Sequence, residues 1–129
     1  MPAELFTDDW LAACNRALAE RSVPLTSGAD RLVVTELIAQ APPGRHAAIT
    51  LVADADGVRL VAGEDPTASA WLTVSMPDAE ALHAGSLDPA RALVEGRIRI
   101  RGDFRAVVDA VGMLAVAHDA LRTRAVATD

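Results

Sequence analysis

The side chains that could carry acid–base or metal chemistry are few and widely spaced. The three histidines, His46, His83 and His118, do not have the i, i+3 or i+4 spacing that places two metal ligands on one helix face. We expect His46 and His83 at the surface, the first beside a turn and the second beside a helix end. His118 falls on the apolar stripe of the last predicted helix. It either packs at the edge of the core or provides a polar group at one end of an apolar pocket.

Two further reactive side chains lie among apolar residues. Glu36 alternates with Val34 and Ile38 in a segment rich in β-branched residues. It either faces solvent with them or is a buried carboxylate that could titrate, and the pattern leaves both open. Cys14 lies in the middle of the apolar stripe of the first predicted helix, so we expect a buried, unreactive thiol.

Motifs for other kinds of chemistry are missing from the sequence. There is no glycine-rich phosphate loop, no nucleophile elbow and no cysteine pair with metal-ligand spacing. We therefore predict no catalytic residue, no metal and no cofactor, and we lean towards a protein that is not an enzyme. The net charge of −6 disfavours nucleic acid as a partner.

Membrane insertion and secretion are also not expected. No apolar run approaches the ~18 residues that a spanning helix needs. The first residues lack the basic and then apolar regions of a signal peptide, so the expected location is the cytoplasm.

A short row of arginines is the one concentration of positive charge. Arg97, Arg99 and Arg101 alternate with Ile98 and Ile100. This alternation predicts a strand with one solvated face. Arginines on such a strand also prevent the sheet edge from pairing with another protein chain. The alternative is a contact surface for an anionic headgroup or an acidic partner.

Hydrophobic periodicity and turn signals predict an α-β-β-β-β-α-α-β-α order of elements within one domain. Because the strands alternate apolar and polar residues, they are expected to be mainly antiparallel. The fold class is α+β, with a five-stranded mainly antiparallel sheet covered on one face by helices. The domain spans 1–129, with its core at about 8–122. The elements are expected at 8–21 (helix), 32–40, 46–53, 58–62 and 70–76 (strands), 77–85 and 88–95 (helices), 97–101 (strand) and 103–122 (helix).

An ordered series of short motifs resembles the sterol carrier protein type-2 family, the lipid-transfer domain. The series consists of Gly-Glu-Asp-Pro at 63–66, Ala-Trp-Leu-Thr-Val-Ser-Met at 70–76, Ala-Gly-Ser-Leu-Asp-Pro at 84–89 and Glu-Gly-Arg-Ile-Arg-Ile-Arg-Gly-Asp at 95–103. The resemblance covers roughly residues 30–115 and suggests a bacterial stand-alone member. It implies a curved sheet with an apolar tunnel between sheet and helices that holds sterols, acyl chains or similar lipids.

The alternation within each element, and not a family pattern, predicts which side chains line such a tunnel. The alternative is that the same residues fill a solid core. The 27 alanines favour a pocket, because small side chains leave space between layers. Trp71 points away from this face, as a lid on the far side or as a contact to a partner. The predicted lining residues are Leu51, Leu60, Leu72, Val74, Met76, Leu93, Ile98, Ile100, Phe104, Val107, Val108, Val111, Leu114 and His118.

The predicted function is a non-catalytic carrier for a lipid or another apolar small molecule, without nucleic acid and without stable membrane insertion. One alternative is a small enzyme of the cyclase or isomerase type in a bacterial biosynthetic pathway, with His118 as general acid or base. The other is an accessory or dimerisation subunit, whose partner would be a larger enzyme or a second copy of the chain.

Overall fold

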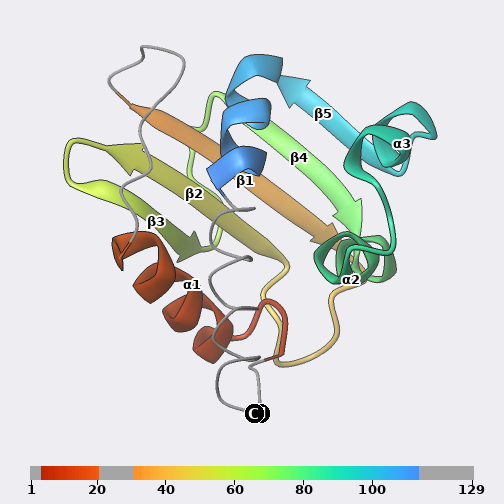
Figure 1. Ribbon diagram of the computed structural model, residues 1–129, viewed down its shortest axis with the longest axis horizontal. Helices are drawn as coiled ribbons and strands as arrows, with labels where there is room; N and C mark the ends of the chain where they lie inside the picture. Colours follow the sequence, from red (N-terminus) through yellow and green to blue (C-terminus); the bar gives the residue numbers. More distant parts are fainter. Residues whose placement is uncertain (1–3, 21–30, 114–129) are drawn as a thin grey trace.

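The computed structural model describes residues 4–20 and 31–113, and within them the elements follow the predicted order (Figure 1). The α+β fold class is therefore confirmed. The last helix covers 104–113 of the described residues. The other elements are α1 (Asp8–Glu20), β1 (Leu32–Ala39), β2 (Ala48–Asp54), β3 (Gly57–Ala62), β4 (Ala70–Ser75), α2 (Met76–Ala84), α3 (Pro89–Val94) and β5 (Ile98–Gly102).

The five strands form one sheet in the order β3-β2-β1-β4-β5. Three of the neighbouring pairs are antiparallel, as predicted, and β1 pairs with β4 in parallel. The parallel pair arises because the chain leaves β3 at one edge of the sheet. The β3–β4 connection then passes across the face of β2 and β1 that the described helices do not cover, and β4 forms on the far side of β1. Along β1, Glu36 lies opposite Ile49 of β2 and Leu72 of β4, which places it in the middle of the sheet.

Local sequence signals set the ends of the helices. The Thr7 hydroxyl accepts a hydrogen bond from the Trp10 amide at 3.2 Å and so caps α1. Asp88 caps α3 in the same way, and Gly85 ends α2 in a left-handed conformation. The helix α2 begins at Met76, earlier than predicted, because the hydroxyl of Ser75 accepts the amide of Asp78.

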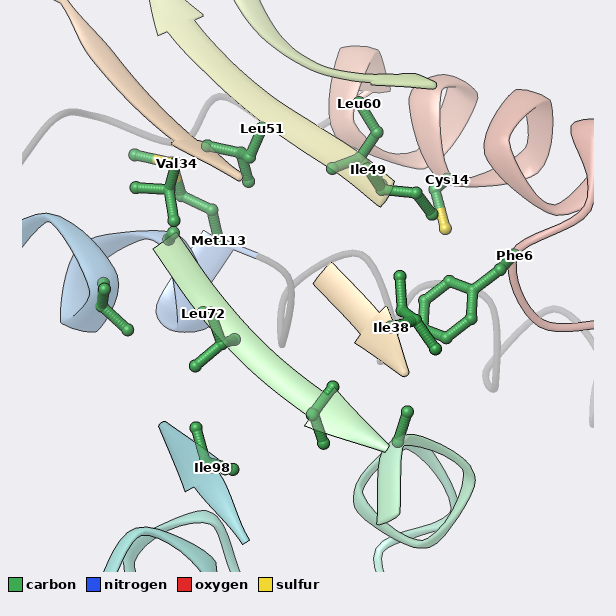
Figure 2. Packing of buried hydrophobic residues seen from close by; sticks show 14 of the residues in the cluster. Phe6, Cys14, Val34, Ile38, Ile49, Leu51, Leu60, Leu72, Ile98 and Met113 are labelled. Atoms are coloured by element: carbon green, nitrogen blue, oxygen red, sulfur yellow. The ribbon is translucent and has the colours of Figure 1, made fainter. Parts of the chain in front are cut away.

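The main core lies between the inner face of the sheet and the helices (Figure 2). Alternate residues of β1, β2 and β4 point into it, and Cys14 of α1 and Met113 of the last helix cover them. Phe6, which precedes α1, is fully buried in the same core cluster as Ile38. One strand begins later than predicted, because the amide of His46 donates to the Phe6 carbonyl at 2.9 Å and not to a neighbouring strand.

The outer face of the sheet carries no helix among the described residues, yet its centre is buried. The β3–β4 connection crosses this face and covers it. The hydroxyl oxygens of Thr35 and Thr50 lie 2.8 Å apart, and Thr50 also donates to the carbonyl of Gly63 in the connection. These pairings satisfy two hydroxyls that would otherwise be costly to bury. A small second cluster lies beside them, formed by Val33, Val52, Ala68 and the partly buried Trp71.

The end of β5 approaches the start of β4 so closely that only glycine fits at Gly102. Its φ is +95°, and a β-carbon there would lie 2.4 Å from the carbonyl oxygen of Ser69. We therefore expect Gly102→Ala to lower the free energy of unfolding by about 2 kcal/mol, from backbone strain and this collision. Urea unfolding would measure the loss.

The matched control is Gly112→Ala, since Gly112 lies in the last helix and a β-carbon there would meet nothing within 4 Å. Alanine favours a helix over glycine, so this variant is expected to gain up to about 1 kcal/mol. Equal effects at the two glycines would contradict the steric explanation.

Candidate ligand-binding groove

A groove of about 420 Å³ lies between the inner face of β1, β4 and β5 and the helices α2, α3 and 104–113. A volume of this size is typical of sites that hold small organic ligands. The lining is almost wholly apolar, with Glu36 and His83 as its two ionisable side chains among the described residues. The lining residues are Glu36, Leu72, Leu82, His83, Gly85, Pro89, Ala90, Leu93, Ile98, Ile100, Phe104, Val107, Val108 and Val111.

The last helix both packs on the core and lines the groove. Ala106 and Ala110, four residues apart on one face, are buried in the core. The larger Phe104 and Val108 project into the groove, and each keeps 53% of its surface exposed. Exposed apolar side chains gathered in a concave surface are typical of a binding site.

The predicted lining residues fall into four groups. Leu72, Leu93, Ile98, Ile100, Phe104, Val107, Val108 and Val111 lie along the groove. Leu51 and Leu60 border a second cavity of about 20 Å³, which is next to the groove because Glu36, Leu72, His83, Val107 and Val111 line both. Val74 and Met76 are buried in the core. Leu114 and His118 lie outside the described residues.

Glu36 belongs to the inner face of the sheet, which resolves the alternatives that the sequence left open. Its neighbours on that face, Val34 and Ile38, are buried in the core, and Glu36 lines both cavities. No hydrogen bond or ion pair links its carboxyl to another side chain in the described part of the chain. Burial among apolar side chains raises the pKa of Glu36 to about 7. Near neutral pH this group can therefore both donate and accept a hydrogen bond.

His83, expected at the surface beside a helix end, is only partly exposed. Its ring packs edge-to-face against Phe6 and Trp10, with ring centroids 5.6 Å and 5.8 Å away. These residues come from α2 and from the N-terminal segment, so no local pattern in the sequence signals their contact. His83 thereby forms part of the wall of both cavities.

His46 lies at the surface beside the β1–β2 turn, as expected, with 32% of its side chain exposed. Its Nε2 lies 2.6 Å from the Oδ1 of Asp8 at the start of α1. Next to it, Arg45 donates to the carbonyl of Leu5 and forms an ion pair with Glu4. The β1–β2 turn thus holds the N-terminal segment, and with it Phe6, against the core.

Among the described residues, the groove contains neither an activated nucleophile nor a cluster of metal ligands. Cys14 is buried in the core, and burial raises the pKa of its thiol to about 12, so it is not a ready nucleophile. Within residues 4–20 and 31–113 no cluster of ligands suited to a metal ion occurs. The arrangement can hold an apolar molecule and form a hydrogen bond with one polar group on it.

On the opposite face, Arg99 and Arg101 are exposed, as their alternation predicts. The guanidinium carbon of Arg101 lies 4.8 Å from the centroid of the Trp71 ring, a cation–π contact. Trp71 is half-buried and packs on the second cluster, so it is part of the cover of the outer face.

None of the helices described is both long and apolar enough to cross a membrane.

Residues 28–114 match the model of the SCP-2 sterol transfer family. A search of curated protein sequences finds no significant match. A solved Thermus thermophilus protein, whose description suggests a sterol carrier protein, shares 20% identity over 95% of this chain and 92% of its own, with a TM-score of 0.60. Sterol carrier protein 2 of Yarrowia lipolytica gives 17% identity, 90% and 95% coverage and a TM-score of 0.58.

Part of a larger enzyme has the same fold. A variant of a Pseudomonas sec-alkylsulfatase shares 18% identity with 83% of this chain, with a TM-score of 0.60. The chain spans only 16% of the length of that enzyme. At these identities the solved structures establish the fold.

Proposed function

Because the chain belongs to the SCP-2 sterol transfer family, we propose that it binds and carries a lipid or another apolar small molecule without changing it chemically. The observation that supports this most directly is the groove of about 420 Å³ with its apolar lining. The bound ligand would be enclosed between the sheet and the helices, as in a tunnel. The proposal also includes a cytoplasmic location.

The affinity would come mainly from apolar surface that leaves water. Phe104, Val108 and Val111 are exposed along the groove and would be covered by a ligand. Burial of apolar surface contributes about 25 cal/mol per Å², so each 100 Å² covered adds about 2.5 kcal/mol against the entropy cost of association.

Filling the groove should weaken ligand binding strongly. We expect Val108→Trp to weaken the binding of a fluorescent fatty acyl or sterol probe by more than about tenfold, because the indole would occupy the volume that the ligand needs. Val108 is 53% exposed, so the larger side chain does not have to enter the core. Fluorescence titration measures the affinity, and thermal unfolding checks that the variant remains folded.

Val94→Trp is the matched control, because Val94 is 88% exposed and does not line the groove. This variant should bind as the unmodified protein does. Absence of saturable binding of every probe to the unmodified protein would refute the carrier function. Unchanged binding by Val108→Trp would refute the groove as the site.

A second candidate function is that of an accessory domain or subunit of a larger enzyme. It is favoured by the sec-alkylsulfatase, in which a domain of this fold is a small part of a longer chain. The partner would be such an enzyme or a second copy of this chain. Light scattering on the purified protein tests the homodimer, since a monomeric mass at working concentration would exclude it.

A further inference from the structure

We propose that Glu36 makes the groove selective for neutral lipid alcohols over lipid carboxylates. This inference rests on the proposed carrier function and specifies its ligand class. It arises from the position of one carboxyl at the junction of a large apolar groove and a cavity of about 20 Å³.

Among the described residues, no arginine that could neutralise a bound anion lines the two cavities around Glu36. Ile49 of β2 and Leu72 of β4 flank it in the sheet. The helices contribute Trp10 of α1 and Val107 and Val111 of the last helix to the lining of the cavity of about 20 Å³. His83 of α2 is the only other ionisable side chain lining either cavity in the described part of the chain, and no arginine lines them.

The small cavity matches the size of a hydroxyl group. A volume of about 20 Å³ has room for roughly one water molecule. A hydroxyl at the end of an apolar chain in the groove could enter it and reach the carboxyl of Glu36. A carboxylate head carries two oxygens and a charge, so it is too large for this space and would need a cation or several donors to replace its hydration.

The protonation chemistry of the two groups also favours an alcohol. A hydroxyl both donates and accepts, so it can form a hydrogen bond with Glu36 in either protonation state. A carboxylate is compatible with protonated Glu36 only, because two ionised carboxylates in an apolar site repel each other strongly. Since burial raises the pKa of Glu36 to about 7, the change from tolerance to repulsion falls within an accessible pH range.

A lipid amine is the remaining head group to consider. Its ammonium would pair with ionised Glu36, but a second charge would then have to leave water for an apolar groove. The desolvation of both charges offsets much of their attraction. The alcohol forms its hydrogen bond without moving a charge out of water, which is why we assign the site to it.

The experiment uses three ligands that differ in the head group alone, namely 1-dodecanol, dodecanoic acid and dodecylamine. Each competes with a neutral fluorescent naphthylamine probe at pH 6.0 and pH 8.5. For the unmodified protein, dodecanoate affinity should fall by more than about tenfold between the two pH values, because Glu36 ionises. The affinity for 1-dodecanol should change by less than about threefold and be the highest of the three at both pH values.

Two variants assign the pH effect to its group. In Glu36→Gln the dodecanoate affinity should become nearly independent of pH, since the amide does not ionise. In His83→Asn the pH effect should persist, which separates Glu36 from the other ionisable group of the groove.

Several outcomes would overturn the assignment while the carrier function stands. These are equal binding of dodecanol and dodecanoate at pH 8.5, a pH effect that survives in Glu36→Gln, one that disappears in His83→Asn, and tighter binding of dodecylamine than of dodecanol. Failure of the neutral probe and all three ligands to bind would instead refute the carrier function itself.

Discussion

Replacement of Phe6 by alanine is expected to lower the free energy of unfolding by about 3–5 kcal/mol, the largest loss we predict for a single side chain. Phe6 is fully buried in the core cluster that also contains Ile38 (Figure 2). Its ring packs edge-to-face on Trp10, with centroids 5.3 Å apart. Its φ of +66° would be kept by alanine, so the loss reflects the missing ring and the cavity left behind. The free energy of unfolding of a domain of this size is about 5–15 kcal/mol in total, so the variant should be only marginally folded.

The chain offers Phe104→Ala as a matched control. The only other phenylalanine, Phe104, keeps 53% of its surface exposed in the groove. Its removal should cost less than about 1 kcal/mol of stability. Urea unfolding of both variants measures the two losses, and a similar loss at the two positions would show that burial of Phe6 does not anchor the N-terminal segment.

The second large effect is a gain in stability for Glu36→Gln that grows with pH. Burial raises the pKa of Glu36 from 4.5 to about 7 in the folded protein. Between these values the unfolded chain releases the proton while the folded protein keeps it, so ionisation favours unfolding as the pH rises. The free energy of unfolding lost through ionisation of Glu36 is small below pH 5 and reaches about 3 kcal/mol above pH 7. The glutamine variant avoids this loss, and should be more stable by about 3 kcal/mol at pH 8 and by less than about 1 kcal/mol at pH 5.

Chemical unfolding at the two pH values tests this difference. Glu64→Gln serves as the control, because Glu64 is exposed in the β3–β4 connection, and its change should stay within about 0.5 kcal/mol at both pH values. A stabilisation of Glu36→Gln that is equal at pH 5 and pH 8 would mean that folding does not raise the pKa of Glu36. A natural sequence that retains such a destabilising carboxyl in an apolar groove fits a role in ligand recognition.

The order and type of the elements followed from the sequence because their signals are local. A strand with alternating apolar residues such as β5, or a cap such as Asp88 before Pro89, requires neighbours only a few residues away. The sheet pairings depend on contacts far apart in sequence. The parallel pairing of β1 with β4 was therefore not apparent before the fold was known.

The candidate site divides in the same way. Alternation correctly grouped Glu36 with Val34 and Ile38, and Leu72 opposite Trp71, because successive side chains of a strand point to opposite faces. It could not say which face the helices cover, since the other face is also partly buried by the β3–β4 connection.

What the sequence by itself determined is the set of elements, their caps and the membership of each side chain in one of two faces. The tertiary structure alone decided that Glu36 faces the groove and that His83 meets Phe6 and Trp10. It also decided that Ala106, Ala110 and Met113 of the last helix pack in the core while Phe104 and Val108 line the groove. These outcomes depend on how whole elements pack against one another, and side-chain size and burial in that packing carry no signature within a single segment.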